Sequence, residues 1–318
     1  MSANKRNGLP FIIKYLVGCA VVFMTFAVGS SYATDTSPSA ESDTIVIGRV
    51  STNPKKHYNH LKPVADYLTE NLRDLGINKT EIIFAKDNKQ MIRYIKQGKV
   101  DLITETAFSA VVFHQQAGAD IVLRRWKKGV PEYSSIIFSR NDSGIQSFDD
   151  LLGKTIAFQD RGSTSSFFIP ASILIREGYE LYELDSPREK PPADAIGFVF
   201  AEKEINISAW VHRNIVAAGA MSDLNWNNER DMPKEFRQHT AILYQSIAFP
   251  RGVELIRKEL DPSIKNRIVD VLASAHESEE GRKMLKAYQK TKQYDALSIQ
   301  DDSLIMAREL QRIVEDHL

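Results

Sequence analysis

The most informative stretch of the sequence is Gly162-Ser163-Thr164-Ser165-Ser166. It follows the apolar run Thr155–Phe158, which predicts a strand, and precedes Phe167–Glu177, which predicts a helix. The first N–H groups of a helix lack internal partners, and the helix dipole adds positive charge at that end. Hydroxyl groups can donate hydrogen bonds beside those amides. The stretch therefore predicts either an anion site or a simple Ser or Thr helix cap.

Strand and helix patterns alternate along the rest of the chain, which indicates an α/β architecture. The strands are expected at Thr44–Gly48, Glu81–Ala85, Asp101–Thr104, Ile121–Arg124, Ser134–Ser139, Thr155–Phe158, Ala195–Phe200, Ile215–Ala220 and Thr240–Tyr244. The helices are expected at His60–Leu72, Asn88–Gln97, Ala107–Ala117, Ser147–Leu152, Phe167–Glu177, Asn206–Arg213, Pro262–Ala275, Glu279–Ala287 and Ser303–His317. Polar, Pro-containing segments 185–195 and 225–238 are expected to be surface loops.

Two strands are expected to join two α/β lobes. The strand Ser134–Ser139 crosses into the second lobe, and Thr240–Tyr244 returns. The first lobe then comprises residues 44–135 and the second lobe residues 136–239. Residues 240–318 complete the first lobe and add the C-terminal helices. This path predicts a ligand cleft between the lobes.

The N-terminal segment has the pattern of a secretion signal. Lys5, Arg6 and Lys14 flank the apolar run Leu16–Val28, which small residues follow up to Ala33. We expect cleavage after Ala33, export to the periplasm, and a flexible lead-in over residues 34–43. An alternative is a lipid anchor on Cys19, because Leu16-Val17-Gly18-Cys19 is similar to a bacterial lipobox.

Composition excludes several classes of protein. The 318 residues contain 41 Lys and Arg and 41 Asp and Glu, so no basic nucleic-acid surface is indicated. Cys19 is the only cysteine, and cleavage after Ala33 would leave a mature chain without disulfides or thiolate nucleophiles. No cofactor motif, metal-ligand pattern or catalytic triad order is present, so we expect a binding protein rather than an enzyme.

The order of several motifs resembles the periplasmic substrate-binding proteins of phosphate, phosphite and phosphonate ABC transporters. The motifs are Leu61–Leu68, Gly98–Asp101, Tyr133–Ser135, Asn141–Ile145, Gly153–Phe158, and Gly162–Ser166 with Pro170. The resemblance implies a type II periplasmic binding fold, a small oxyanion ligand and a membrane permease as partner. We expect a monomer. The resemblance also implies that Ser163, Thr164 and Ser165 hold the oxyanion, with Ser166 in a place where the family usually has Gly.

The sequence departs from the family pattern at two places. Thr106–Ala110 stands where the family commonly has Gly-Pro-Leu-Ser-Tyr, so a ligand-contacting Tyr is lost. Glu204 stands where the family has an oxyanion-contacting His. A carboxylate would repel a phosphonate by about 1 to several kcal/mol, depending on burial. The ligand is therefore an oxyanion, a zwitterion such as an aminoalkylphosphonate, or a compound outside the phosphonates. The alternative is a different spacing of the lobes that leaves Glu204 in solvent.

Three further residues are candidate ligand contacts. Glu105 ends a strand, where α/β ligands usually bind, and the alternative is a solvated strand end. Tyr58 lies in the expected loop Ser51–His60, and Tyr133 stands at the first crossing, where core packing is the alternative.

Two other clusters favour structural interpretations. His57 and His60 lack a third metal ligand nearby. Arg124–Lys128 is interpreted as a solvated loop, with one Arg reaching an anionic ligand as the alternative. Two other functions stay open, namely a sensory receptor that signals to a membrane kinase or chemoreceptor, and a hydrolase on the same scaffold.

Overall fold

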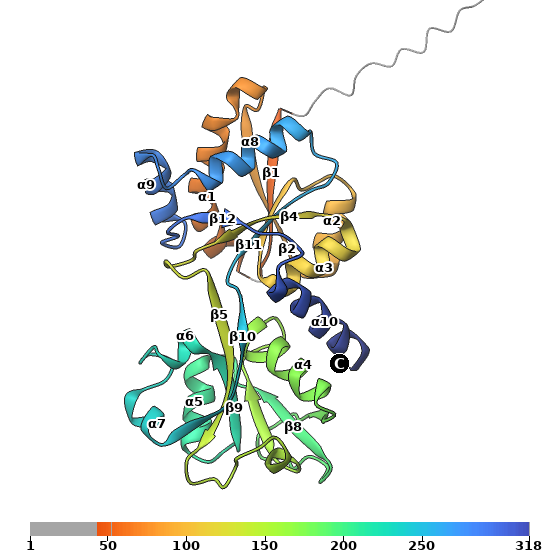
Figure 1. Ribbon diagram of the computed structural model, residues 1–318, viewed down its shortest axis with the longest axis vertical. Helices are drawn as coiled ribbons and strands as arrows, with labels where there is room; N and C mark the ends of the chain where they lie inside the picture. The colour runs from red at the N-terminus through yellow and green to blue at the C-terminus, as the bar shows by residue number, and fades with distance from the viewer. Residues whose placement is uncertain (1–42, 52, 318) are drawn as a thin grey trace, which may run out of the picture. The chain divides into compact units, whose positions relative to one another are not determined.

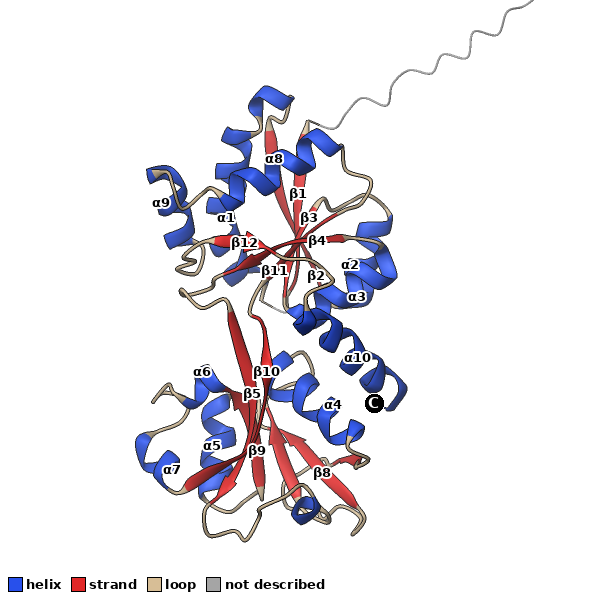
Figure 2. Cartoon of the chain, viewed as in Figure 1, coloured by secondary structure: helices blue, strands red, loops and turns tan. Residues whose placement is uncertain are grey.

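Two mixed β-sheets of six strands each organise the chain (Figures 1 and 2). The computed structural model describes residues 43–51 and 53–317. The expected signal peptide, and the lead-in apart from Asp43, lie outside the described residues. No helix among the described residues is long and apolar enough to cross a membrane. The expected α/β class is confirmed.

The first sheet has the strand order β12-β4-β11-β3-β1-β2. Its strands are β1 (Thr44–Val50), β2 (Lys79–Ala85), β3 (Leu102–Glu105), β4 (Asp120–Arg125), β11 (Val253–Ile256) and β12 (Tyr294–Ala296). β1 pairs parallel with β2 and β3, and β11 lies antiparallel between β3 and β4. The chain therefore returns to its first sheet after it has built the second.

The second sheet has the order β10-β5-β9-β6-β8-β7. Its strands are β5 (Glu132–Arg140), β6 (Thr155–Phe158), β7 (Glu180–Glu183), β8 (Ala195–Phe200), β9 (Ala218–Ser222) and β10 (Thr240–Pro250). The strands β7, β8, β6 and β9 run parallel to one another, whereas β5 runs antiparallel to both β9 and β10.

Alternate residues of a strand point to opposite faces of its sheet, and apolar residues on both faces are covered by helices. In β1, Ile45 and Ile47 pack with the cluster under α1, α8 and α9, whereas Val46 packs on the cluster under α2 and α3. The helices are α1 (Pro54–Asn71), α2 (Asn88–Lys96), α3 (Ala107–Ala117), α4 (Ile169–Arg176), α5 (Glu204–His212), α6 (Asp223–Trp226), α7 (Lys234–Gln238), α8 (Pro262–Ala273), α9 (Glu279–Ala287) and α10 (Asp302–His317). Short turns of other helix types occupy Arg73–Leu75, Asp149–Leu151 and Thr164–Phe168.

The C-terminal helix α10 packs on helices of both sheets. Its Leu304 and Leu310 belong to one buried cluster with Phe108 of α3 and with Ile169 of α4. Phe108 also stacks on Phe168, with the ring centroids 5.7 Å apart. This cluster makes the helix that follows the Ser-Thr stretch part of a core that α3 and α10 share.

Several expected elements have different bounds. The helix α1 begins at Pro54 rather than His60, because Asn53 caps it and Pro54 occupies its first turn. The predicted loop Ser51–His60 is thus mostly helical. The expected loop 225–238 contains part of α6 and all of α7. The strands β7, β11 and β12 were not predicted.

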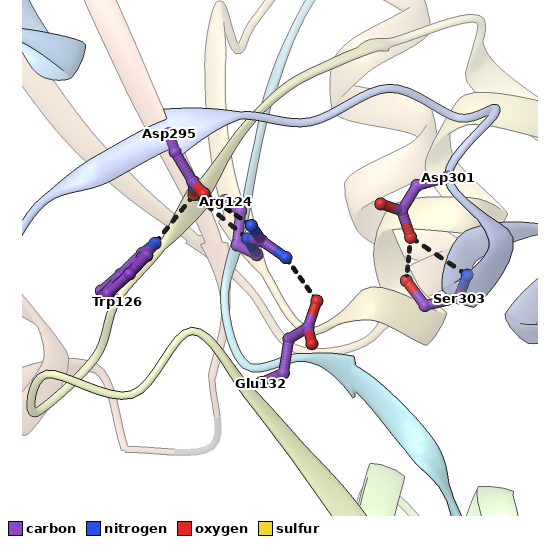
Figure 3. A network of polar contacts seen from close by, with 6 residues as sticks. All are labelled: Arg124, Trp126, Glu132, Asp295, Asp301 and Ser303. Atoms are coloured by element: carbon purple, nitrogen blue, oxygen red, sulfur yellow. Dashed lines mark hydrogen bonds and ion pairs between the residues drawn. The ribbon is translucent and has the colours of Figure 1, made fainter.

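The start of β5 is fastened to the first sheet by Arg124 of β4 (Figure 3). The Arg124 guanidinium donates to the Asp295 carboxylate at 3.1 and 2.5 Å and also pairs with Glu132, the first residue of β5. The indole of Trp126 donates to Asp295 at 2.9 Å. Burial opposes ionisation of Asp295, but the bonds from Arg124 and Trp126 outweigh burial and lower its pKa.

Arg124→Met is expected to lower the free energy of unfolding by about 1–3 kcal/mol, since two partly buried carboxylates lose their cation. The pKa of Asp295 is lowered in the folded state. Its contribution to the free energy of unfolding is therefore present when the pH is above the ordinary carboxyl pKa of about 3.9, and it is lost as the pH falls below that value. Urea unfolding at pH 7 and pH 3.5 measures both effects. The control is Lys62→Met, which removes an exposed ion pair with Asp66 and should change stability little. Equal losses at pH 7 in the two variants would contradict the assignment.

Candidate functional site

The Ser-Thr stretch connects the carboxyl end of β6 to a helix that begins with a wide turn. β6 lies between the parallel strands β8 and β9, so the stretch emerges at the carboxyl edge of the second sheet. The first wide-turn hydrogen bonds are donated by Phe168 N–H to the Ser163 carbonyl, at 3.0 Å, and by Ile169 N–H to the Thr164 carbonyl. The N–H groups of Thr164 and Ser165 precede these bonds. This end of the helix thus has the donors and dipole of an anion site.

Two of the four hydroxyls hold the stretch in place. Ser166 is 1% exposed, and its hydroxyl accepts from Gln159 N–H at 3.0 Å and donates to the carbonyl of Ala220 in β9. The Ser163 hydroxyl accepts from Ser166 N–H at 3.2 Å and so caps the helix. Ser163 therefore fulfils the cap interpretation, and Ser166 links the stretch to β9.

The other two hydroxyls are differently placed. Thr164 is 4% exposed, yet its Oγ1 has no hydrogen-bond partner among the described residues. Ser165 is half-buried, and its carbonyl accepts from the Ser135 hydroxyl at 2.6 Å. A buried unpaired hydroxyl costs about 1–3 kcal/mol, so the Thr164 hydroxyl needs an explanation.

Tyr133 lies beside these two hydroxyls. It is the second residue of β5 and is buried. Burial raises the pKa of Tyr133, and the neighbouring Thr164 and Ser165 hydroxyls and the Arg251 cation offset part of the rise. The next residue, Ser134, donates its N–H to Asp223 at 3.1 Å. The structure therefore brings Tyr133 together with Thr164 and Ser165.

Glu105 is buried rather than a solvated strand end. It is 8% exposed, and its carboxylate accepts from Val50 N–H at 2.7 Å and from Thr106 N–H at 3.3 Å. Burial raises the pKa of Glu105, although Arg49 and Arg125 act against the rise. Its carboxylate thus ties the end of β3 to the end of β1.

Glu204 lies near two other acidic side chains. It is the first residue of α5, and burial raises its pKa, with further increases from Asp231 and Asp160. Asp160 accepts from Gly162 N–H at 2.8 Å, at the foot of the stretch. Glu204 is therefore close to Asp160, which bonds to the first residue of the stretch, and its role as a ligand contact stays a prediction.

Tyr58 lies elsewhere in the described structure. It is on α1, 43% exposed, and lines a surface depression of about 580 Å³ with Lys62, Asp66 and Glu70. No described contact joins Tyr58 to the Ser-Thr stretch. A ligand role for Tyr58 stays a prediction without structural support.

The basic run Arg124–Lys128 is not a solvated loop, so that interpretation is wrong. Arg124 is bound by two carboxylates, and Arg125 is 2% exposed, with its guanidinium 4.3 Å from the Tyr288 ring centroid. Lys127 is half-buried. Burial and the cations Arg125 and Arg251 lower the pKa of Lys127 to about 7.

The two histidines have local partners. His57 Nδ1 lies 2.7 Å from the Ser51 hydroxyl, and His60 Nδ1 lies 3.4 Å from the amide of Gln289. Burial, and then Arg49, lower the pKa of His57 to about 4. Among residues 43–51 and 53–317, no group of three or more His, Cys, Asp or Glu side chains is arranged to hold a metal ion.

The chain forms two α/β lobes, each with its own sheet, and the paired strands β5 and β10 connect them. A helix N-terminus that suits an anion lies beside β5. This arrangement is that of a type II periplasmic binding protein. A family model described as ABC transporter, phosphonate, periplasmic substrate-binding protein matches residues 47–302. The chain belongs to this family, and the membership implies a periplasmic location.

Three relatives illustrate the membership. The Phosphonates-binding periplasmic protein of Escherichia coli is 25% identical over 75% of this chain and 68% of its own length. The Phosphate-import protein PhnD of Mycolicibacterium smegmatis is 29% identical, but the match spans only half of each chain. XAC2383 from Xanthomonas citri has been solved bound to chloride, with 32% sequence identity to this chain, and bound to ATP, with 31% identity. Each comparison has a TM-score of 0.79 and covers 87% of this chain and 100% of that chain.

Ser166→Ala is expected to lower the free energy of unfolding by about 1–3 kcal/mol, since a buried N–H and a buried carbonyl lose their shared partner. Ser147→Ala, which removes an exposed hydroxyl, is the control and should stay within about 0.5 kcal/mol of the parent protein. Denaturant unfolding of the ligand-free proteins measures the difference. A fully stable Ser166→Ala protein would show that the bonds to Gln159 and Ala220 contribute nothing.

Lys127→Met is expected to raise the melting temperature of the ligand-free protein. The folded state lowers the Lys127 pKa, so the charged lysine destabilises the fold, fully so below about pH 7. The cost declines as the pH rises from about 7 towards the ordinary lysine value of 10.5. Differential scanning calorimetry at pH 6, 8 and 10 measures this trend. The exposed neighbour Lys128→Met is the control, and a melting temperature lowered by Lys127→Met at pH 6 would contradict the prediction.

Proposed function

We propose that this chain captures a small phosphate-, phosphite- or phosphonate-type oxyanion between its two lobes and delivers it to the permease of an ABC transporter. The observation that carries the proposal is the Thr164 hydroxyl, which is buried at a helix N-terminus beside the Tyr133 hydroxyl and makes no hydrogen bond of regular geometry within the described residues. A tetrahedral oxyanion would accept a hydrogen bond from it.

Neutral donors at this helix end suit an oxyanion. The Thr164 and Ser165 hydroxyls stand beside the N–H groups that precede the first hydrogen bond of the helix. Such groups together with the helix dipole favour a bound anion without any direct cation. The Tyr133 hydroxyl lies next to both and adds a third donor from β5. We propose Thr164, Ser165 and Tyr133 as ligand contacts, with Ser163 and Ser166 holding their geometry.

The relatives support a phosphorus oxyanion. The two curated relatives are named for phosphonates and for phosphate import, and the Xanthomonas citri protein was solved with ATP. Phosphonate, phosphate and ATP share a tetrahedral phosphorus atom that carries charged oxygens. The match spans about half the length of the Mycolicibacterium smegmatis protein.

The two candidate carboxylates contribute differently to ligand choice. Glu105 is buried, and each of its two oxygens accepts from one backbone N–H group, so its carboxylate has a structural role at the ends of β1 and β3. Glu204 remains as the acid near the stretch, and its raised pKa lowers its cost beside an anion. We propose Glu204 as a further ligand contact, at the position where other family members have His.

Export and delivery complete the proposal. Residues 1–33 are proposed to act as a cleaved signal peptide, with a lipid anchor on Cys19 as the alternative. The protein is proposed to act as a monomer and to present its closed, ligand-bound form to the permease. Mass determination of the mature protein from a native membrane fraction would distinguish cleavage after Ala33 from lipidation.

A thermal-shift panel of phosphate, phosphite, methylphosphonate, 2-aminoethylphosphonate and pyrophosphate tests the oxyanion site. A ligand at about 100 times its Kd should stabilise the parent protein by about 2.7 kcal/mol. Thr164→Val keeps the side-chain shape but removes the unpaired hydroxyl, so it should abolish most of the shift without loss of stability in the free protein. Ser147→Ala is the control. The proposal fails if no compound raises the melting temperature, or if Thr164→Val binds as well as the parent protein.

A further inference from the structure

Four cations from separate parts of the chain meet near the crossing strands. Arg49 is at the end of β1, Arg125 ends β4, Lys127 is in the turn before β5, and Arg251 follows β10. The Arg251 guanidinium donates to the Lys127 carbonyl at 2.8 Å, and Arg125 N–H donates to the Gly252 carbonyl at 2.9 Å. These two hydrogen bonds, one from a side chain and one between backbone groups, connect the turn at Lys127 to the chain that follows β10.

Of these four cations, Arg125 alone forms an ion pair among the described residues. Glu254 lies 3.4 Å from Arg125, and burial raises the pKa of Glu254 despite that neighbour. Glu105 is held by backbone N–H groups. Among the described residues, no carboxylate forms an ion pair with Arg49, Lys127 or Arg251, and the buried Arg49 Nε has no hydrogen-bond partner.

Such an arrangement is unfavourable in the free protein. Charges removed from water without a partner are costly, and like charges add to the cost. The lowered Lys127 pKa reflects both effects. An anion that bound here would replace the lost water and relieve the repulsion. Arg is suited to phosphoryl groups because its planar guanidinium can donate two parallel hydrogen bonds.

The Tyr133 side chain lies near both this group of cations and the hydroxyls of the proposed oxyanion site. Arg251 is close enough to Tyr133 to affect its pKa, and Tyr133 lies beside Thr164 and Ser165. Asp223, the first residue of α6, faces Arg251 and Tyr133 and accepts a hydrogen bond from Ser134 N–H. A ligand with one anionic group at Thr164 would therefore extend towards cations rather than towards a carboxylate cluster.

We propose that Arg49, Lys127 and Arg251 form a second anion subsite and that the ligand carries linked phosphoryl groups, as in a pyrophosphate or a nucleoside polyphosphate. This inference rests on the proposed function, since the first phosphoryl group is assigned to Thr164 and Ser165. A simple alkylphosphonate would leave the cations without an anion. An aminoalkylphosphonate would place a positive amine against them.

Isothermal titration calorimetry with phosphate, methylphosphonate, 2-aminoethylphosphonate, pyrophosphate, tripolyphosphate and ADP tests the subsite. The parent protein should bind the linked phosphoryl compounds at least about tenfold more tightly than phosphate. Lys127→Met and Arg251→Gln should reduce this preference by about tenfold or more, while phosphate affinity changes only about threefold or less. Lys128→Met is the matched control and should retain the preference. Thermal melting establishes that each variant is folded.

Proton uptake supplies a readout that a structural role would not change. A bound anion raises the pKa of Lys127. The parent protein should therefore gain at most about one proton when it binds the anion at pH 8, and Lys127→Met should gain less. Titrations in buffers of different ionisation enthalpy measure this uptake. The subsite is overturned if pyrophosphate and tripolyphosphate bind no more tightly than phosphate, or if Lys127→Met retains the preference. Absence of all phosphoryl binding would instead overturn the proposed function, and binding that survives Thr164→Val would overturn only the loop site.

Discussion

The antiparallel pairing of β5 with β10 is the constraint on which the rest of the structure depends. The pairing runs from Thr240 opposite Arg140 to Pro250 opposite Glu132, with two register irregularities. β5 belongs to the second sheet through β9, yet its first residue is held by Arg124 of the first sheet (Figure 3). A single strand thus fixes Tyr133, Ser134 and Ser135 in contact with the Ser-Thr stretch and with Asp223.

Acidic and basic side chains form two separate groups near this strand. Glu204, Asp160 and Asp231 lie together near the foot of the stretch. Arg251 lies near both Lys127 and Tyr133. An elongated anion can avoid the first group and approach the second, which orients it along one direction only. Electrostatics would then determine which end of a ligand reaches Thr164.

The sequence allowed the fold class to be predicted because its central strands are continuous apolar runs. The strands Thr155–Phe158 and Ala195–Phe200 have the predicted bounds, since buried parallel strands show little polar alternation. β7 was missed because Glu180–Glu183 is a largely exposed edge strand with two acids. β11 was missed because its four residues depend on β3 and β4 for pairing rather than on their own propensity.

The candidate site was only partly predictable. The Ser-Thr stretch is local in sequence, so its pattern could be recognised, but the division of labour among its hydroxyls depends on β9 and β5. Arg49, Lys127 and Arg251 are far apart in the chain and meet only because β1, β4 and β10 end at one place. Nothing local distinguishes these cations from the other basic residues of the chain.

The hydrogen bonds of Ser166 have a consequence for how the protein recognises its ligand. Because Gln159, Ala220 and Ser163 already fix the stretch, it does not have to become ordered when a ligand arrives. For the proposed oxyanion ligand, the protein would then lose little conformational entropy at this end, which lowers the cost of binding. A rigid set of donors also discriminates by shape, because it cannot adapt to a planar carboxylate as readily as to a tetrahedral phosphoryl group. Selectivity at this end is thus built into the resting architecture and precedes any movement of the lobes.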